Sequence, residues 1–179
     1  KKSTSKVALK WKKVAGAAGY QIYMKTNSGT YKKIKTITNG TTVSYVKSGL
    51  TQGYRYSFKV RAYKKLSNNT VYGSFCGSKT VRMGIAKPSK ITLKQVSKTK
   101  VKITFPKVAG VSGYEVSMKY SSGNKYKKVA TLTKSSKNVY IKTGLKKGRT
   151  YTFKVRAYKV VNGKKYYSSY TNLKKITLK

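Results

Sequence analysis

Apolar and polar residues alternate along much of the chain, and the alternation is clearest at residues 20–24 and 56–62. A period of two residues is typical of β-strands that bury one face and expose the other. Breaks rich in glycine or asparagine separate the alternating runs at residues 27–29, 39–40 and 67–69. No window keeps a helical period, so the pattern predicts an all-β protein.

The sequence repeats itself once, at an offset of about 95 residues. The stretch Val60–Lys64 recurs unchanged as Val155–Lys159, and two further stretches recur at nearly the same offset. The join between the copies lies near Met83–Ser89, which contains one of only two prolines in the chain. Two modules are therefore predicted, at residues 1–84 and 85–179.

Turn signals and alternation place seven short strands in the second module. They are residues 91–95, 100–105, 113–120, 126–132, 138–141, 150–160 and 166–177. Seven strands in about 90 residues predict a sandwich of two sheets. Trp11 aligns with Phe105, so the first strand of the second module has no counterpart after Lys1. We expect the first module to be truncated at its N-terminus and to lack that strand.

Three features recur in the same order in both modules. The first is an aromatic residue in the second strand, Trp11 or Phe105. The others are V-x-G-x-x-G-Y, at Val14–Tyr20 and Val108–Tyr114, and G-L-x-x-G-x-x-Y-x-F-x-V-R-A-Y, at Gly49–Tyr63 and Gly144–Tyr158.

With these features the chain resembles tandem fibronectin type III modules, most closely those of bacterial cell-surface and secreted proteins. The resemblance implies two immunoglobulin-like β-sandwiches with a tyrosine corner at Tyr56 and at Tyr151. It also implies a spacer, an adhesion unit or an accessory domain, in an extracellular or cell-surface location.

The charge of the chain is more unusual than its hydrophobic content. Lys and Arg number 43, against a single acidic residue, Glu115, and the net charge is +42. Such a chain attracts polyanions of any kind. All but five of the cations are lysine, a flexible point charge that favours diffuse attraction over bidentate recognition. Natural selection and deliberate supercharging would leave the same composition.

The inventory of functional groups predicts a protein that is not an enzyme. There is no histidine and no aspartate, so the commonest general base and metal ligand is missing. One glutamate cannot form the paired carboxylates of a glycosidase, and one cysteine or one carboxylate cannot hold zinc or calcium. We expect no catalytic residues, no metal and no cofactor. No apolar run is long enough to span a membrane, so no membrane insertion is expected.

Two single residues allow more than one interpretation. Alternation places Glu115 on the outer face of its strand, where a surface ion pair with Lys154 or Arg156 is expected. The alternative is a buried carboxylate that assists an isopeptide bond between Lys and Asn, as in some bacterial adhesins. Cys76 has no disulfide partner in the chain and is predicted to be a half-buried residue of the last strand of the first module. A reactive thiol is the alternative.

The outer face of the long strand in each module contains the candidate binding residues. Cations that alternate with aromatic rings can hold phosphates and stack on bases or sugars. The candidate polyanion-contacting residues are Tyr23, Lys59, Arg61, Tyr63, Lys154, Arg156 and Tyr158. The alternative is an ordinary solvated sheet face, on which the stems of Lys and Arg cover the tyrosines.

Three functions remain open. The main hypothesis is a non-catalytic extracellular binding module whose partners are polyanions, namely a cell-wall polymer such as teichoic acid, nucleic acid such as extracellular DNA, or a sulfated glycan. The second is a structural spacer or stalk of a bacterial surface protein, which the repetition favours. The third is an accessory domain of an enzyme that lies outside this sequence. The charge favours the first hypothesis.

Overall fold

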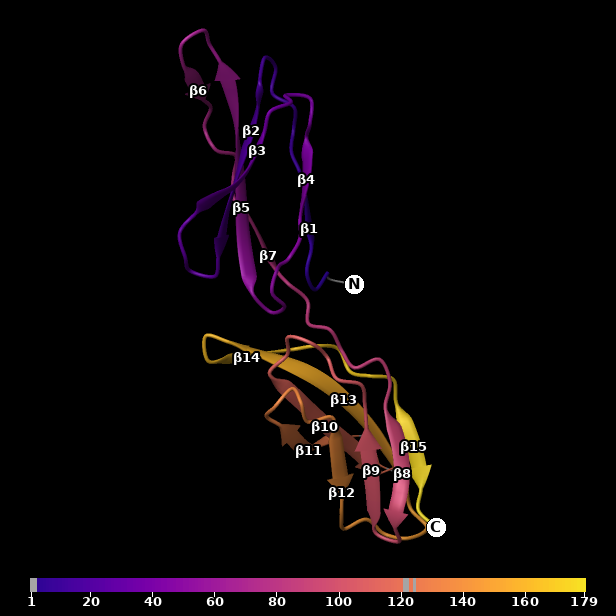
Figure 1. The fold of residues 1–179 in the computed structure, drawn as a ribbon. Coiled ribbons are helices and arrows are strands. Elements are labelled where there is room, and N and C mark those ends of the chain that lie inside the picture. The colour runs from indigo at the N-terminus through magenta and orange to yellow at the C-terminus, as the bar shows by residue number, and fades with distance from the viewer. Residues whose placement is uncertain (1–2, 121–122, 124) are drawn as a thin grey trace. The chain divides into compact units, whose positions relative to one another are not determined.

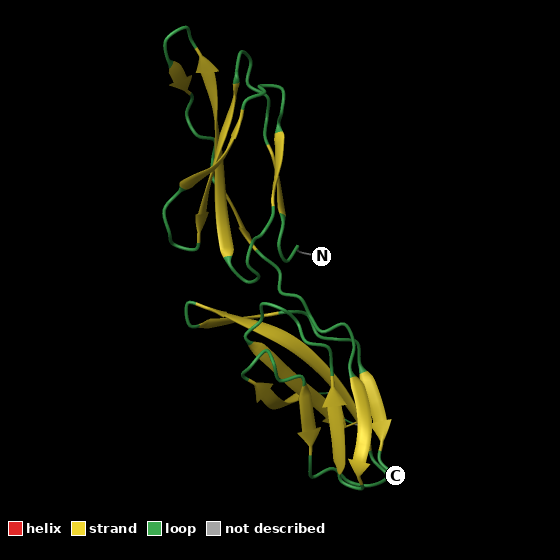
Figure 2. Ribbon diagram, in the orientation of Figure 1, coloured by secondary structure: helices red, strands yellow, loops and turns green. Residues whose placement is uncertain are grey.

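The computed structural model describes residues 3–120, 123 and 125–179, and these residues form strands, turns and loops. The first two residues of the first predicted module lie outside this range. The chain divides into two compact units, Lys1–Gly84 and Ile85–Lys179, which are described separately (Figure 1). In both units the described residues contain no helix (Figure 2), and hence none that could cross a membrane. The all-β prediction is confirmed.

The first unit consists of two antiparallel sheets. In the smaller sheet, β1 (Val7–Lys10) pairs with β4 (Ser44–Lys47). In the larger sheet the order is β3–β2–β5–β6, and β7 pairs with the first half of β5. The bounds of these strands are Gly19–Thr26 for β2, Lys32–Ile37 for β3, Arg55–Lys65 for β5, Thr70–Tyr72 for β6 and Lys79–Arg82 for β7.

The second unit repeats this plan with one more strand. Its larger sheet has the order β11–β10–β13–β14, and β15 also pairs with β13. Its smaller sheet has the order β12–β9–β8. The bounds are Thr92–Ser97 for β8, Lys100–Thr104 for β9, Gly113–Tyr120 for β10, Lys127–Leu132 for β11, Val139–Lys142 for β12, Thr150–Val161 for β13, Lys164–Tyr167 for β14 and Lys174–Thr177 for β15. No described strand of the first unit corresponds to β8.

The single last strand predicted at residues 166–177 was wrong, because the segment forms two strands, β14 and β15. Between them the Ser168 and Thr171 N–H groups still donate to the Ala157 and Val155 carbonyls of β13, at 2.9 and 2.8 Å, but the acceptors that they offer in return are side-chain oxygens. The hydroxyl of Ser168 accepts a hydrogen bond from the Ala157 N–H at 2.9 Å, and that of Thr171 accepts one from the Val155 N–H at 3.1 Å. Side-chain oxygens thus replace main-chain carbonyls in the middle of the ladder, which interrupts the regular strand.

Each unit has a hydrophobic core between its two sheets. In the second unit the core is one cluster, in which Val101, Ile103 and Phe153 have no exposed surface. In the first unit the buried residues fall into two smaller clusters, around Phe58 and around Ile22. The inward residues alternate along the strands, as the sequence pattern predicts.

A tyrosine fixes the same loop in both units. The Tyr56 hydroxyl accepts a hydrogen bond from the Thr51 N–H at 3.0 Å, and the Tyr151 hydroxyl accepts one from the Lys146 N–H at 2.7 Å. Both rings are buried, so each phenol oxygen finds its partner in the loop before its own strand. The two predicted tyrosine corners are confirmed.

Candidate functional site

Cationic and aromatic side chains alternate in a row on the outer face of the larger sheet. In the second unit, Lys154 Nζ lies 3.8 Å from the ring centroid of Tyr126 and 4.2 Å from that of Tyr170. The Arg156 guanidinium carbon lies 4.9 Å from the Tyr170 centroid and 3.8 Å from that of Tyr167. We call these five residues the second ladder.

The first unit has the same row, which we call the first ladder. Lys59 Nζ lies 4.4 Å from the ring centroid of Tyr31 and 3.9 Å from that of Phe75. The Arg61 guanidinium carbon lies 5.0 Å from the Phe75 centroid and 4.1 Å from that of Tyr72. Each residue stands 95 positions before its counterpart in the second ladder. Cation–π contacts at exposed sites contribute about 0.5–1 kcal/mol each.

The local structure explains how the rows form. Lys59 and Arg61 are two residues apart on β5, so they share a face of the sheet. Tyr72 ends β6, which pairs with β5, whereas Tyr31 precedes β3 and Phe75 lies between β6 and β7. The cations therefore come from the long strand, and two of the three rings come from loops.

Tyr63 and Tyr158 are on the predicted face but are not accessible. Their exposed fractions are 6% and 2%, so the expectation that they point into solvent was wrong. Each ring lies against a glycine of the neighbouring strand, Gly19 or Gly113, where a Cβ would come within 2.7 Å of the tyrosine oxygen. The absence of a side chain on these glycines lets the rings lie flat against the sheet.

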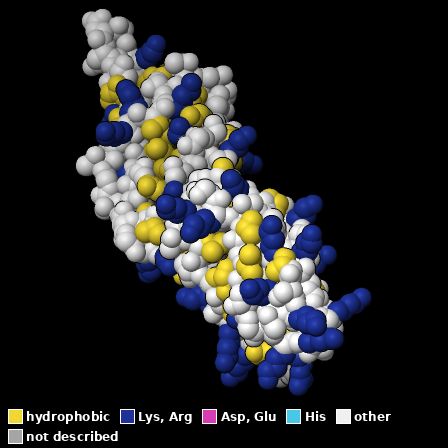
Figure 3. Space-filling model, turned by 60° about the horizontal axis from the view of Figure 1, so that its bottom comes forward, with side chains coloured by type: hydrophobic (Ala, Val, Ile, Leu, Met, Phe, Trp, Pro, Cys, Tyr) yellow, Lys and Arg dark blue, Asp and Glu magenta, His cyan; other side chains and the backbone are white. Residues whose placement is uncertain are grey.

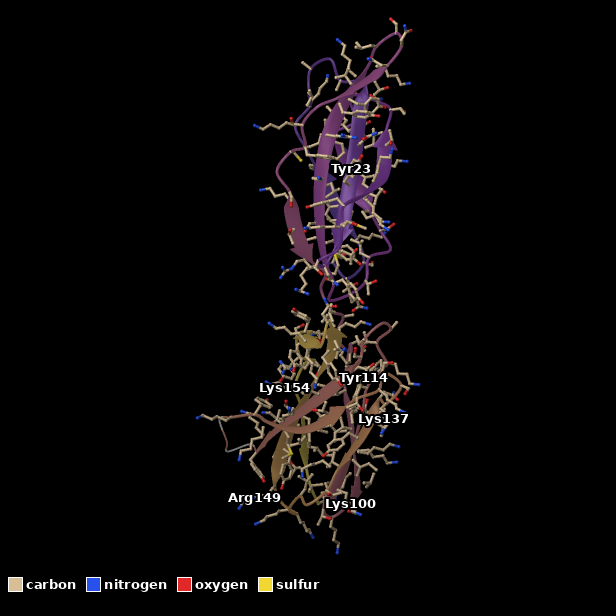
Figure 4. All side chains as sticks on the ribbon, turned by 90° about the vertical axis from the view of Figure 1, so that its left-hand side faces the viewer. Tyr23, Lys100, Tyr114, Lys137, Arg149 and Lys154 are labelled. Atoms are coloured by element: carbon tan, nitrogen blue, oxygen red, sulfur yellow. The ribbon has the colours of Figure 1, made fainter. Side chains whose placement is uncertain are left out.

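Tyr23 joins the first ladder through Arg61. Its hydroxyl accepts a hydrogen bond from Arg61 Nη2 at 3.1 Å, and its ring packs edge-on against Phe75 at 4.9 Å. The side-chain oxygen of the buried Gln21 accepts two further bonds, from Arg61 Nε at 3.0 Å and Nη2 at 2.8 Å. Figure 4 labels Tyr23 on β2 and Lys154 on β13. The other candidate residues of the first unit lie on β5, and those of the second unit lie on β13.

Glu115 takes the place of Gln21 in the second unit. Arg156 donates two hydrogen bonds to Glu115 Oε2, from Nε at 3.1 Å and from Nη2 at 2.7 Å. The Tyr167 hydroxyl donates to Oε1 at 3.3 Å, and Lys128 Nζ lies 3.9 Å from the same oxygen. The predicted ion pair with Arg156 is confirmed, but its predicted position at the surface was wrong, because the Glu115 side chain is only 3% exposed.

The residues around Glu115 explain why it is buried, and they bear on the alternative interpretation, in which this carboxylate assists an isopeptide bond. Alternation along β10 gives the correct face of the sheet, but Arg156 and Tyr167 cover the carboxylate on that face. The side chains that these contacts bring to the carboxylate belong to Arg, Tyr and Lys. No asparagine is among them, so burial of Glu115 does not in itself support an isopeptide bond.

Burial also changes the titration of tyrosines in the second unit. The pKa of Tyr167 is raised by burial, by the charge of Glu115 and by the hydrogen bond to it, and the charge of Arg156 opposes this in part. Burial and then the Glu115 charge raise the pKa of Tyr158, and burial raises the pKa of Tyr126. Because the ordinary pKa of a tyrosine is already 10.0, these shifts extend the pH range over which the three phenols stay neutral to values above 10.

Cys76 differs from its prediction. It is exposed and lies between β6 and β7 rather than within the last strand. Its N–H donates to the Val60 carbonyl at 2.8 Å, and its Sγ accepts a hydrogen bond from the Val60 N–H at 3.3 Å. Thr171 makes the corresponding pair of contacts with Val155 in the second unit. The thiol thus accepts a hydrogen bond from a main-chain N–H of the long strand β5.

Both units have an open hollow beside one hairpin of the larger sheet, which joins β2 to β3 in the first unit and β10 to β11 in the second. In the second unit its volume is about 550 Å³, and its lining includes the buried Met118 and Leu145 together with four lysines. In the first unit it is about 450 Å³ and includes Met24 and Lys32. Lysines contribute to the lining of both hollows, beside apolar and small residues.

Exposed positive charge is spread around each unit rather than gathered at one place. Figure 3 shows Lys and Arg side chains scattered over the face that it presents. Lys100, Lys137 and Arg149 are exposed at separate places on the second unit (Figure 4). Because Glu115 is buried, none of the exposed side chains that the structure describes is acidic. The described part also contains no cluster of three or more His, Cys, Asp or Glu that could hold a metal ion.

Comparison with known proteins identifies the fold. The family model of the fibronectin type III domain matches residues 86–172. The structure is similar to a two-domain fibronectin type III segment of chicken tenascin, with a TM-score of 0.80 and 17% identity over 99% of this chain and 94% of that one. Both units have the fibronectin type III fold.

A second similar structure contains the FN1–FN3 domains of chicken CNTN1, with a TM-score of 0.48 and 17% identity. This chain matches it over 99% of its own length and 61% of the other. None of the curated proteins matches the sequence. Fibronectin type III modules are commonly non-catalytic binding or spacer domains, and they occur generally in extracellular or surface proteins.

The aromatic members of both ladders and the side chains that hold the arginines were not predicted from the sequence. A signal for the rings was present, because aromatic residues recur at an offset of 95 at three positions. These pairs are Tyr31 and Tyr126, Tyr72 and Tyr167, and Phe75 and Tyr170. Gln21 and Glu115 both accept hydrogen bonds from the arginine of their ladder, but no sign of this shared role is visible in the sequence, because one residue is neutral and the other is charged.

Proposed function

We propose that these two fibronectin type III modules bind polyanions outside the cell, by diffuse attraction to lysines on both modules. The observation that supports this most directly is the position of Glu115. The only acidic side chain in the sequence is buried against Arg156 at 2.7 Å. An approaching anion therefore meets no exposed acidic side chain on the described surface, and long-range attraction acts from every side.

The distribution of charge supports weak discrimination between polyanions. Lys and Arg number 18 through Ala86 and 25 from Lys87 onward, so both modules contribute to binding. Lysine lacks the planar fork with which arginine recognises phosphate or sulfate in two-point contact. Teichoic acid, extracellular DNA and sulfated glycans are the extracellular polymers of this kind, and the first of them suits the bacterial surface protein that the sequence resembles.

The ladders have a secondary part in this function. Their cations lie between rings and are only partly exposed, so much of their surface is already in contact with protein. Arg156 also has its charge neutralised by Glu115, whereas Arg61 is held by the neutral Gln21. We infer that the exposed lysines supply most of the attraction, and that the first ladder contributes more than the second.

The test measures affinity against salt concentration for a duplex DNA, heparin and a teichoic acid. Counter-ion release predicts a linear fall of log affinity with log salt, with a slope of about −0.9 for each DNA phosphate that is neutralised. The variant Lys12→Gln, Lys13→Gln, Lys146→Gln, Lys147→Gln neutralises four exposed lysines in loops of both modules. It should flatten the slope for all three polymers. Absence of binding to any of them at about 20 mM salt would exclude the proposal.

A spacer or stalk is the second candidate function, and the tandem repetition of one fold favours it. The similarity to a two-domain segment over 99% of this chain is a specific observation in its support. In this case the charge serves solubility, and the ladders serve the stability of each module. Failure of all polyanions to bind, together with unchanged folding of the lysine variant, would favour the spacer.

A further inference from the structure

Thr152 lies on the outer face of β13, two residues before Lys154 of the second ladder. It is fully buried, and its hydroxyl has no hydrogen-bond partner among the described residues. A buried hydroxyl without a partner costs free energy, and native proteins contain few of them. The equivalent hydroxyl of the first unit, that of Ser57, is paired with the Thr80 hydroxyl at 2.7 Å. Thr152 therefore needs an explanation that Ser57 does not.

The side chains beside Thr152 on this face include three lysines. The register places Lys119 of β10 opposite Thr152 on one side and Lys175 of β15 opposite it on the other. Lys154 shares the face because it follows two residues later on the same strand. Side chains directly opposite each other have Cβ atoms about 4.5–5.5 Å apart. Lys175 stands where the first unit has Thr80, so a charge replaces the partner hydroxyl.

A second hydroxyl without a partner belongs to Tyr126, whose ring lies against two of these lysines. Its centroid is 3.8 Å from Lys154 Nζ and 5.5 Å from Lys119 Nζ. Its hydroxyl oxygen is buried, and it too has no hydrogen-bond partner in the part of the chain that the structure describes. Two hydroxyls that can donate thus lie near three ammonium groups on one patch of the sheet.

No acidic side chain compensates these lysines. Glu115 is the only acidic residue of the chain, and it pairs with Arg156. It stands four residues before Lys119 on β10, which is roughly 14 Å along the strand. Like charges that face each other across a sheet repel. An anion on this patch would relieve that repulsion and would accept hydrogen bonds from the two hydroxyls.

We propose that this patch is a binding site for a phosphate group. Its donors are three ammonium groups and two hydroxyls, those of Lys119, Lys154, Lys175, Thr152 and Tyr126. A phosphate group carries negative charge and several strong acceptor oxygens, which match a set of separate donors. Lys175 is exposed and the other two lysines are partly exposed, so the anion arrives from solvent and displaces the flexible lysine stems beside the hydroxyls. The inference rests on polyanion binding as the proposed function, and it adds one ordered contact to that diffuse attraction.

The probe is inorganic phosphate, added to the whole chain at constant ionic strength and followed by amide NMR, with chloride as the matched anion. We expect saturable shifts at Thr152, Lys119 and Lys175 with about 1–10 mM phosphate, and no such shifts with chloride. Glycerol phosphate and a DNA dinucleotide then present the same group as it occurs in teichoic acid and in nucleic acid. The one that binds more tightly identifies the polymer that the site favours.

Thr152→Val tests the hydroxyl without removing charge. Valine keeps the branched shape, so the variant should melt at the same temperature as the wild-type protein or higher, because it loses a buried group without a partner. Its phosphate affinity should fall at least about fivefold, the effect of losing one hydrogen bond to a charged group. A lower melting temperature would show that the hydroxyl already has a partner in the folded chain, and would contradict the proposal.

Lys175→Thr reproduces the arrangement of the first unit, because a threonine there can pair with Thr152 as Thr80 pairs with Ser57. It should lower phosphate affinity at least about tenfold, since a charge and a free donor are lost together. The matched control is Lys174→Thr, which removes the same charge from the adjacent position of β15, on the opposite face. This control should keep the affinity within about twofold, because exposed charges contribute little at short range.

Three outcomes would overturn the proposal. They are equal shifts with phosphate and chloride, unchanged phosphate affinity of Thr152→Val, and equal losses in Lys175→Thr and Lys174→Thr. Each would mean that anions are attracted by the overall charge and not by this patch. The salt dependence of polymer binding is measured separately, so its failure would leave the phosphate result unchanged. Failure of the phosphate result would likewise leave the diffuse attraction unchanged.

Discussion

The two ladders have the same five positions and differ chiefly in the side chain that holds the arginine. In the second unit Glu115 accepts two hydrogen bonds from Arg156, and in the first unit Gln21 accepts two from Arg61 through the same pair of nitrogens. A neutral amide oxygen and a charged carboxylate oxygen therefore hold the arginine in the same geometry. The charge of the acceptor can differ between the units without changing that geometry.

The difference shows what a single acidic residue does in a chain of net charge +42. Glu115 lies where a guanidinium, a phenol and an ammonium converge on it. Removing a carboxylate from water is costly, and such an arrangement offsets that cost only when the lone pairs are well satisfied. The second ladder is thus internally compensated, whereas the first retains the full charge of Arg61.

The largest expected effect concerns the cores rather than the ladders. Phe105 is 2% exposed and packs against Tyr114 at 4.7 Å, whereas its counterpart Trp11 is partly exposed and packs against Tyr20 at 5.3 Å. Phe105→Ala should lower the free energy of unfolding of the second unit by about 3–5 kcal/mol. Trp11→Ala should cost the first unit less, because less of the ring is buried. Calorimetry of the two variants makes the comparison, and equal losses would show that the partial exposure of Trp11 does not reduce its contribution to stability.

The next effect tests the clamp of the second ladder. Glu115→Ala leaves the Arg156 guanidinium without its acceptor, and because Arg156 is 26% exposed the loss should be about 2–3 kcal/mol. Glu115→Gln reproduces the clamp of the first unit and should cost about 1 kcal/mol or less. Chemical denaturation of both variants is the measurement. If Gln is as damaging as Ala, charge and not geometry holds the arginine.

The sequence could predict the features that depend on the local pattern of residues, but not those that depend on which distant residues pack over a sheet. The strands and the face of Lys59 and Arg61 follow from a period of two, which is a local property of the chain. The burial of Tyr63 and Glu115 does not, because alternation gives the face of a sheet but not what lies over it. Phe75 belongs to a loop, and the path of a loop depends on the packing of distant strands.

A smaller effect concerns pH, through the hydrogen bond from Tyr167 to Glu115. Burial and the nearby carboxylate raise the pKa of Tyr167 above its ordinary value of 10.0. Between the unfolded and the folded pKa the unfolded chain has lost a proton that the folded one keeps, so the contribution to stability falls as pH rises past 10. Tyr167→Phe should cost about 1 kcal/mol at pH 7, and this cost should shrink above pH 10. A difference between wild type and variant that is constant from pH 7 to 11 would contradict this account.

The smallest effect compares the two ladders as contacts for DNA. Lys59→Gln with Arg61→Gln removes two uncompensated charges from the first unit. Lys154→Gln with Arg156→Gln removes one uncompensated charge and one that Glu115 already neutralises, and it leaves the carboxylate to repel phosphate. Each phosphate contact that is lost reduces the steepness of the salt dependence by about 0.9. Because the second pair also frees the negative charge of Glu115, both pairs lower the local net charge equally, and we expect similar losses of duplex DNA affinity from the two pairs. Glu115→Gln added to the second pair removes the repulsion between the freed carboxylate and DNA phosphate, so the triple variant should bind DNA better than the double variant.

Salt titrations of the three proteins, with circular dichroism to confirm that they are folded, measure these differences. Equal affinities of the double and triple variants would mean that Glu115 remains screened by Lys128 and Tyr167, so that the compensation extends beyond Arg156.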